Sequence, residues 1–370
     1  MRRLRRGFVP ALLIATATLP ASFGQTRGAE RLAAGFPALR PTASTTTAMP
    51  KTDAPLRIRI GPYAGWERCW TLDNGQVEAV VVPQIGRIMQ FRFVGKSGPF
   101  WEDPALHGKH PDPASAEWGN FGGDKTWPAP QADWERVTSR SWPPPVAFDS
   151  MPVEVTVRRD GVVLRSAVDP HYGIRTERVV SLAPDRPTMT VVTSYEKVSG
   201  PPVRVGVWII TQLEDPVAAF ALLPAKSRFP EGYNRQSGDV LPAGLTVDGR
   251  LLSLVRDPER ASKIGTDGER LLWVGVDRML LVESPRIPGA PYPDGESSAE
   301  IYTNPNPKTY VELEMLGPLH DMSPGDRISQ TNAYTLLPRK LTDPKADAAR
   351  VLMPASLTPA SSQSDSTPRP

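Results

Sequence analysis

Residues 153–168 read VEVTVRRDGVVLRSAV, and this stretch decides the fold class. Residues 153–157 alternate strictly between apolar and polar side chains, which is typical of a half-buried strand. Asp160 and Gly161 form a turn signal, and a second apolar run over 162–168 follows at once. The stretch therefore predicts an antiparallel hairpin.

The same strand pattern recurs along most of the chain. Further predicted strands cover 76–82, 87–94, 174–182, 187–198, 203–213, 245–255, 271–276, 279–283, 310–316 and 328–337. No long stretch has apolar residues at helical spacing, and the 42 prolines disfavour helices because proline removes a backbone donor. So many strands in one domain predict an all-β fold, a large antiparallel β-sandwich of two packed sheets.

The two ends of the chain differ from this middle part. Residues 1–24 combine a basic start, an apolar run over 8–19 that is too short to span a membrane, and small residues, which predicts a cleaved signal peptide and a periplasmic or secreted location. Residues 5–9 also resemble a twin-arginine signal, and this alternative to ordinary secretion stays open. We expect a disordered linker over 25–54, the β-sandwich domain over 55–340 and a disordered tail over 341–370.

Charge and cysteine content exclude several classes of protein. The formal charge of +3 becomes −1 when residues 1–24 and their four arginines are removed. The remaining chain has no basic patch, so we expect no nucleic-acid partner. Cys69 is the single cysteine, which rules out an intramolecular disulfide. Its place in a predicted strand favours a buried structural residue over a catalytic thiol.

The segment 100–145 interrupts the strand pattern and is the richest in aromatic residues. It holds five of the nine tryptophans, Trp101, Trp118, Trp127, Trp134 and Trp142. Long ordered loops on a β scaffold often carry function, and flat indoles suit the C–H face of a sugar ring. The alternative is a cluster that packs the loop onto the sandwich. On the first interpretation, Trp127 and Trp134 are partly exposed and line a sugar cleft.

The centre of this segment, residues 120–134, reads NFGGDKTWPAPQADW. It resembles the Gly-Gly-x-Lys-x-Trp-Pro-Ala-Pro-Gln signature of a bacterial family known as domain of unknown function 4380. That family is similar to the galactose mutarotase-like superfamily. Residues 82–88 resemble the strand–glycine–strand entry of such domains, and 310–319 with 323–326 resemble their C-terminal end. The resemblance covers about residues 56–338 and implies a mutarotase-like sandwich.

The resemblance also implies a chemistry. In the sugar epimerases of the superfamily, a glutamate in a late Leu-Glu step takes a proton from the anomeric hydroxyl, and a histidine protonates the ring oxygen. Leu313-Glu314 matches that step, which makes Glu314 the candidate base. Glu312 shares its strand parity and is a second candidate. Gln212 stands where the histidine is expected, and His171 in a turn is a candidate substitute.

We therefore expect an exported carbohydrate-recognising protein. One hypothesis is an enzyme of the aldose 1-epimerase type; the alternatives are a non-catalytic carbohydrate-binding protein and a relative of sugar lyases or glycosidases. The candidate substrate-binding residues are Arg87, Asn120, Asp124, Lys125, Trp127, Gln131, Trp134, Trp208 and Gln212.

A metal site is not expected. His107 and His110 lie near Asp103 and Asp112, but a His-x-x-His spacing in a Pro/Gly loop guarantees no shared face. We expect neither a metal nor a cofactor. The sequence does not predict an oligomeric state.

Overall fold

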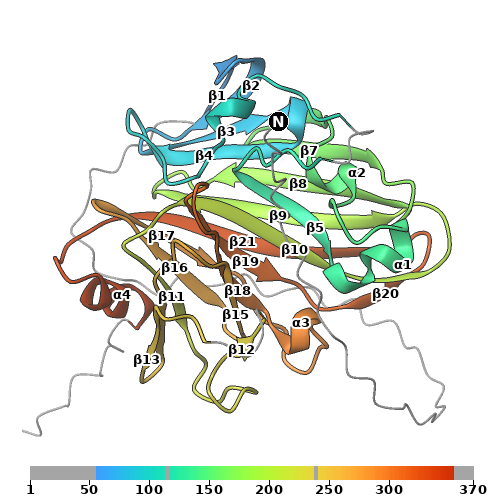
Figure 1. Ribbon diagram of the computed structural model, residues 1–370. Helices are drawn as coiled ribbons and strands as arrows, with labels where there is room; N and C mark the ends of the chain where they lie inside the picture. The colour runs from blue at the N-terminus through green and yellow to red at the C-terminus, as the bar shows by residue number, and fades with distance from the viewer. Residues whose placement is uncertain (1–55, 113–116, 237–240, 354–370) are drawn as a thin grey trace, which may run out of the picture. The chain divides into compact units, whose positions relative to one another are not determined.

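The computed structural model describes residues 56–112, 117–236 and 241–353. The expectations for residues 1–24 and 25–54, and for the part of the tail over 354–370, therefore lie outside the described residues. Within the described part, two antiparallel sheets form two layers (Figure 1). The prediction of a large all-β sandwich is confirmed.

The first sheet has eleven strands. In spatial order they are β1 Arg57–Tyr63, β2 Trp66–Asp73, β3 Val77–Val82, β4 Arg87–Phe93, β5 Asp124–Ala129, β10 Val203–Glu214, β19 Tyr310–Leu316, β18 Ala299–Thr303, β15 Ser262–Thr266 and β12 Asn234–Arg235, with β20 His320–Met322 paired to β10. The long strand β10 lies between β5 and β19. The sheet thus brings segments far apart in sequence to its centre.

The second sheet has ten strands and contains the hairpin that was predicted over residues 153–168. Its spatial order is β13 Leu245–Asp248, β14 Leu251–Leu254, β11 Ala218–Leu222, β16 Arg270–Val274, β17 Arg278–Glu283, β21 Arg327–Pro338, β9 Thr188–Lys197, β8 Ile174–Leu182, β7 Gly161–Val168 and β6 Glu154–Arg158. The pair β6 and β7 forms the predicted hairpin, with Arg158 opposite Gly161.

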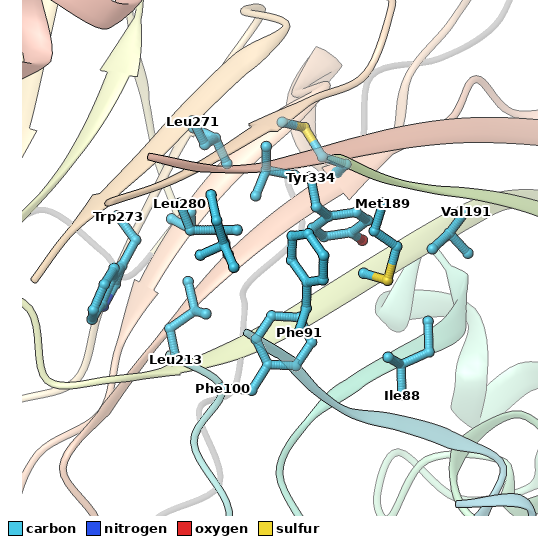
Figure 2. Packing of buried hydrophobic residues seen from close by; sticks show 14 of the residues in the cluster. Ile88, Phe91, Phe100, Met189, Val191, Leu213, Leu271, Trp273, Leu280 and Tyr334 are labelled. Atoms are coloured by element: carbon cyan, nitrogen blue, oxygen red, sulfur yellow. The ribbon is translucent and has the colours of Figure 1, made fainter. Parts of the chain in front are cut away.

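The main hydrophobic core lies between the two sheets. Phe91 of β4 and Phe100 meet Tyr334 of β21 and Leu280 of β17 (Figure 2). Full burial of such a side chain stabilises a fold by roughly 1.5–3 kcal/mol relative to exposure. We call the side of the eleven-stranded sheet that packs on this core the inner face, and its other side the outer face.

Short helices connect strands of the two sheets or follow the last strand. They are the 3₁₀ turns η1 Pro83–Ile85, η2 Pro104–Leu106 and η3 Gln131–Asp133, and the helices α1 Trp134–Thr138, α2 Val146–Asp149, α3 Pro293–Glu296 and α4 Pro344–Leu352. Helix α2 contacts β5, and α4 packs against β16 and β11 (Figure 1).

Helix α4 corrects the domain boundary expected at residue 340. Ala348 and Leu352 are buried in an apolar cluster with Phe220 and Leu272. The Asp343 side chain caps the helix by accepting from the backbone N–H groups of residues 345 and 346, and a proline occupies the first helical position. These are standard helix-start residues, so residues 344–352 are an ordered part of the domain and not disordered tail.

Candidate functional site

The centre of the outer face carries two adjacent rows of polar side chains. In one row, Lys125 of β5, Ile210 of β10, Glu314 of β19 and Glu300 of β18 lie opposite one another in turn. In the neighbouring row, Gln212, Glu312, Tyr302 and Lys263 do the same. Residues directly opposite in antiparallel strands share a face and lie close together. We call Lys125, Gln212, Lys263, Glu300, Glu312 and Glu314 the polar cluster.

The strand parity expected for β19 is confirmed. Val311, Leu313 and Met315 lie in the core between the sheets, so Glu312 and Glu314 point to the outer face. Both carboxylates are nevertheless buried, with exposed fractions of 8% and 1%. A buried carboxylate costs free energy unless it meets a partner, so the partners of each define the site.

Glu314 is held by two donors on one oxygen. The Trp208 Nε1–H donates to Glu314 Oε2 at 2.7 Å, and Lys263 Nζ donates to the same oxygen at 2.9 Å. Lys263 Nζ also lies 2.6 Å from Glu300 Oε2 and 4.6 Å from the centre of the Trp208 ring. Glu314 Oε1 is buried and has no hydrogen-bond partner within the described residues.

The contact between Lys263 and Glu300 affects the pKa of both side chains. Burial disfavours the ammonium ion, but Glu300 and Glu314 raise the pKa of Lys263 well above its usual value. Burial raises the pKa of Glu300 well above the ordinary range, although Lys263 opposes that change. The side chains thus form a tight group beside Trp208 in which Lys263 keeps its proton.

Glu312 and Lys125 form a looser pair. Lys125 Nζ lies 3.7 Å from Glu312 Oε1, beyond hydrogen-bond distance, and has no hydrogen-bond partner in the described part of the chain. Burial raises the pKa of Glu312 to about 7, with Lys125 opposing and Glu314 adding to the rise. Burial also lowers the pKa of Lys125 to about 8, with Glu312 opposing. Both groups therefore titrate near neutrality.

Two buried amides stand next to this pair. Gln212 lies opposite Glu312 in the strand register and is 0% exposed. Neither polar atom of its side-chain amide makes a hydrogen bond of good geometry with the described residues, and the same holds for Asn120 Oδ1. Both amides lower the pKa of Tyr310, which burial raises well above its usual value, so both lie close to the Tyr310 hydroxyl.

A carboxylate that the sequence analysis did not single out organises the tryptophan segment. Asp149 Oδ1 accepts from Arg87 Nη2 and from Trp127 Nε1, both at 2.8 Å, and its Oδ2 accepts from Trp118 Nε1 at 3.1 Å. The rings of Trp127 and Trp118 lie 5.0 and 6.0 Å from Lys125 Nζ. Arg87 is thereby a fully buried support for the indoles that surround the lysine.

The exposure expected for Trp127 and Trp134 is wrong. Trp127 is 4% exposed and Trp134 is 0% exposed. The Trp134 indole N–H donates to the Pro128 carbonyl oxygen at 2.8 Å, and the two rings pack edge to face in an apolar cluster. Trp134 therefore packs the loop onto the sandwich, as the alternative interpretation expected. Trp127 also packs in this cluster, but its ring contacts Lys125 as well.

Three further candidates lie apart from the polar cluster. Asp124 faces inward, where Arg178 of the other sheet donates to it. Gln131 is an exposed residue of η3. His171 is exposed in the turn between β7 and β8 of the ten-stranded sheet, whereas Glu314 lies in the eleven-stranded sheet. The structure does not bring these residues together with Lys125 and Glu312.

Sequence reasoning missed Lys263, Glu300 and Asp294. Asp294 has a left-handed backbone (φ 50°), unusual outside glycine, and its carbonyl oxygen accepts from the Asn234 and Gln236 side chains. Burial raises the pKa of Asp294, with Lys263 opposing and Glu314 adding to the rise. Lys263 and Glu300 lie in β15 and β18, two strands that were not predicted from the sequence, and only the sheet order shows that they meet.

Among the described residues, three further features concern a metal site, a membrane span and a surface pocket. The described residues contain no group of three or more His, Cys, Asp and Glu side chains arranged to hold a metal ion. His107 Nε2 lies 3.1 Å from Glu102 Oε2, and Cys69 is buried as predicted. No helix in the described ranges is long and apolar enough to cross a membrane. An open pocket of about 540 Å³ lies elsewhere and is rich in basic residues, including Lys226, Arg228, Arg250, Arg270 and Arg286.

The two packed antiparallel sheets define the class of protein, a β-sandwich of the galactose mutarotase type. A solved structure from Escherichia coli K12, provisionally described as an aldose 1-epimerase, is similar with a TM-score of 0.50 at 12% identity, over 74% of this chain and 99% of its own. Galactose mutarotase-like proteins from Lactobacillus casei ATCC 334 and Clostridium acetobutylicum have TM-scores of 0.48 and 0.49 at 10% identity. The Lactobacillus casei structure matches 73% of this chain over 100% of its own length, and the Clostridium acetobutylicum structure matches 77% of this chain over 99% of its own length.

No family model matches the chain, and no curated protein matches it. The resemblance of residues 120–134 to domain of unknown function 4380 therefore stays a prediction. At 12% identity the likeness to the Escherichia coli structure shows the fold alone.

Proposed function

We propose that the protein binds a sugar at the polar cluster and acts on it by acid–base chemistry, as an enzyme of the aldose epimerase type. The observation that carries this proposal is a group of buried polar atoms that make no hydrogen bond of good geometry within the described chain: Asn120 Oδ1, Lys125 Nζ, both amide atoms of Gln212, and Glu314 Oε1. An unsatisfied buried polar group costs about 1–3 kcal/mol. Sugar hydroxyls both donate and accept, so one sugar can satisfy donors and acceptors at once.

The neighbouring side chains suit the same ligand. Trp208 and Trp127 present indole rings beside the two lysines, with edge-to-face packing that fixes their orientation. Glu312 and Glu314 supply carboxylates that can accept a proton from a sugar hydroxyl. The galactose mutarotase type of fold supports the choice of a sugar over other polyhydroxylated ligands.

A non-catalytic carbohydrate-binding protein is the second candidate. It is favoured by Gln212, an amide that binds a hydroxyl but cannot donate a catalytic proton, at the position where a histidine is expected. The contact of Lys263 with Glu314 points the same way, because it occupies a carboxylate oxygen that a base would use.

The two candidates are separated by binding and turnover measured on the same sugars. A glycan array on the mature protein identifies the sugars that bind, and polarimetry on each freshly dissolved sugar follows the interconversion of its anomers. The enzyme proposal expects acceleration for at least one bound sugar, lost by about 10²–10⁴-fold in a Glu312→Gln, Glu314→Gln double variant. Binding without acceleration for every bound sugar would establish the second candidate instead.

We also propose export through the N-terminal signal, with cleavage near Gly24. The support is the order of basic, apolar and small residues over 1–24. Intact-mass measurement of the protein from a periplasmic fraction tests this. An uncleaved protein confined to the cytoplasm would refute it.

A further inference from the structure

We propose that Glu312 is the proton acceptor and Lys125 the proton donor of this site, and that Glu314 is a positioning residue. The inference rests on the proposed function and assigns its chemistry. It replaces two expectations from the resemblance, a base at Glu314 and a histidine acid.

The contacts of Glu314 and Glu312 differ in kind. Glu314 Oε2 receives two hydrogen bonds, one of them from an ammonium group that Glu300 also holds. These two contacts occupy the Oε2 oxygen of Glu314. Such a carboxylate is suited to fix Trp208 and Lys263 in place. Glu312, in contrast, has no ammonium group within hydrogen-bond distance, since Lys125 Nζ stands 3.7 Å away, and its other polar neighbour is the neutral amide of Gln212.

Glu312 and Lys125 stand close enough together for both to contact neighbouring oxygens of one ligand. At 3.7 Å the carboxylate and the ammonium group attract each other without a direct hydrogen bond. Reacting oxygens of a bound sugar beside this pair would donate to Glu312 and accept from Lys125. The two side chains come from β19 and β5 on either side of β10, so sheet pairing fixes their spacing.

Burial tunes the same two groups toward neutrality. It raises the pKa of Glu312 to about 7 and lowers the pKa of Lys125 to about 8. A base and an acid whose pKa values lie close to the working pH transfer protons most effectively. Other charges face the pair. Arg87 lowers the pKa of Lys125, and Asp149 and Glu314 raise it. Lys263 lowers the pKa of Glu312, and Glu314 raises it.

The resulting step balances without a further reactant. The Glu312 carboxylate removes the proton of the anomeric hydroxyl, and that electron pair forms the aldehyde C=O as the bond from the anomeric carbon to the ring oxygen breaks. The Lys125 ammonium group gives its proton to the ring oxygen. After rotation of the aldehyde, ring closure on the other face returns one proton to Lys125, and Glu312 returns the other to the new anomeric hydroxyl.

The test compares single variants of the full mature chain: Glu312→Gln, Glu314→Gln, Lys125→Arg and Lys125→Met. Exposed Glu259→Gln and Lys96→Met serve as matched controls. The readouts are kcat and KM for anomer interconversion of a sugar that binds, measured from pH 5.5 to pH 9.5. Equilibrium unfolding of every variant verifies that it folds.

We expect Glu312→Gln and both Lys125 variants to lower kcat by about 10²–10⁴-fold, the usual contribution of a positioned acid or base. The wild-type rate should rise as Glu312 loses its proton near pH 7 and fall as Lys125 loses its proton near pH 8. Lys125→Arg should lack the alkaline fall, because arginine keeps its proton. Glu314→Gln should act mainly on KM.

Three results would overturn the inference in distinguishable ways. Full kcat in Glu312→Gln with loss in Glu314→Gln would return the base to Glu314 and leave the enzyme proposal standing. Unchanged kcat in Lys125→Met would remove the donor role alone. A wild type that accelerates no bound sugar would refute the enzyme proposal together with this inference.

A titration gives an independent measurement that does not depend on turnover. In ¹⁵N-lysine NMR, the signal missing from Lys125→Arg identifies Lys125. We expect it to titrate near pH 8 and to move lower in Glu312→Gln, because the carboxylate raises the pKa of the lysine. A Lys125 that titrates above pH 10 in both proteins would overturn the donor role.

Discussion

Asp124 and Lys125 are neighbours in β5, are both buried and charged, and point to opposite faces of the sheet. Asp124 is fully satisfied on the inner face. It is ion-paired with Arg178 of β8 and accepts from the Thr211 hydroxyl and the Tyr334 hydroxyl, each at 2.7 Å. Lys125 on the outer face has no hydrogen bond within the described chain.

The difference separates a network whose hydrogen bonds are all made from a cluster in which several are not. The inner network joins the two sheets, since Arg178 and Tyr334 belong to the second sheet and Thr211 to the first. A buried charge is tolerated when all its hydrogen bonds are made. The outer polar cluster leaves several groups unsatisfied, a cost that a bound sugar would remove.

The largest expected effect comes from breaking the inner network. Asp124→Ala leaves Arg178 buried without its counter-charge, and we expect a loss of about 3–5 kcal/mol in the free energy of unfolding. Urea unfolding measures it, with the exposed Asp185→Ala as control. A loss below about 1 kcal/mol would mean that the inner network does not differ from the outer cluster in the way proposed.

A smaller effect is expected where the tryptophan segment meets the outer face. Trp127→Phe removes the indole N–H that donates to Asp149, and a hydrogen bond to a charged group contributes about 1.5–3 kcal/mol. Denaturant unfolding compares it with Trp142→Phe, because Trp142 is 42% exposed. Equal stability of the two variants would show that the link to Asp149 is unimportant.

The fold was predictable because alternation is a local signal. The hairpin over 153–168 and the parity of β19 follow from side chains that point alternately to two faces. The order of strands in the sheets is a long-range property, and the sequence did not indicate that β10 lies between β5 and β19. Helix α4 was missed because its nine residues are too few for a clear apolar period.

The site was predictable only in part, for the same reason. Glu312, Glu314, Lys125, Gln212 and Trp208 were candidates and lie together on the outer face. Their partners Lys263, Glu300 and Asp149 come from segments without a recognisable motif, and register alone places two of them. Tryptophan burial was misjudged because composition does not distinguish a ligand platform from a packed loop.

A still smaller change in stability is expected at Lys125, with a distinct pH dependence. Lys125→Met should raise the free energy of unfolding at pH 7 by about 1 kcal/mol, because it removes a buried ammonium group that makes no hydrogen bond, and Glu312 can take up a proton in the variant. The sign of the pH effect follows from the lowered pKa. Between pH 8 and pH 10.5 the unfolded chain holds the lysine proton and the folded chain does not, so the wild type gains stability as the pH rises.

Urea unfolding of both proteins from pH 7 to pH 10.5 measures this difference. The gain should be missing from Lys125→Met and present in the control Lys96→Met. Parallel pH dependence of Lys125→Met and wild type would indicate an ordinary, well-solvated lysine and would remove the contrast with Asp124.

The smallest effect is expected at His171, which sharpens the comparison because it belongs to neither network. Its backbone N–H donates to Asp169 Oδ1 at 2.9 Å, a contact that survives truncation of the side chain. Exposed side chains away from such features change stability by about 0.5 kcal/mol or less when replaced. We therefore expect His171→Ala to match the wild type in stability, in sugar affinity and in any turnover. Turnover lost by about 10²-fold or more with unchanged affinity would instead identify His171 as the missing acid. That outcome would require the β7–β8 turn of the second sheet to reach the substrate, and the proton donor would then not be Lys125.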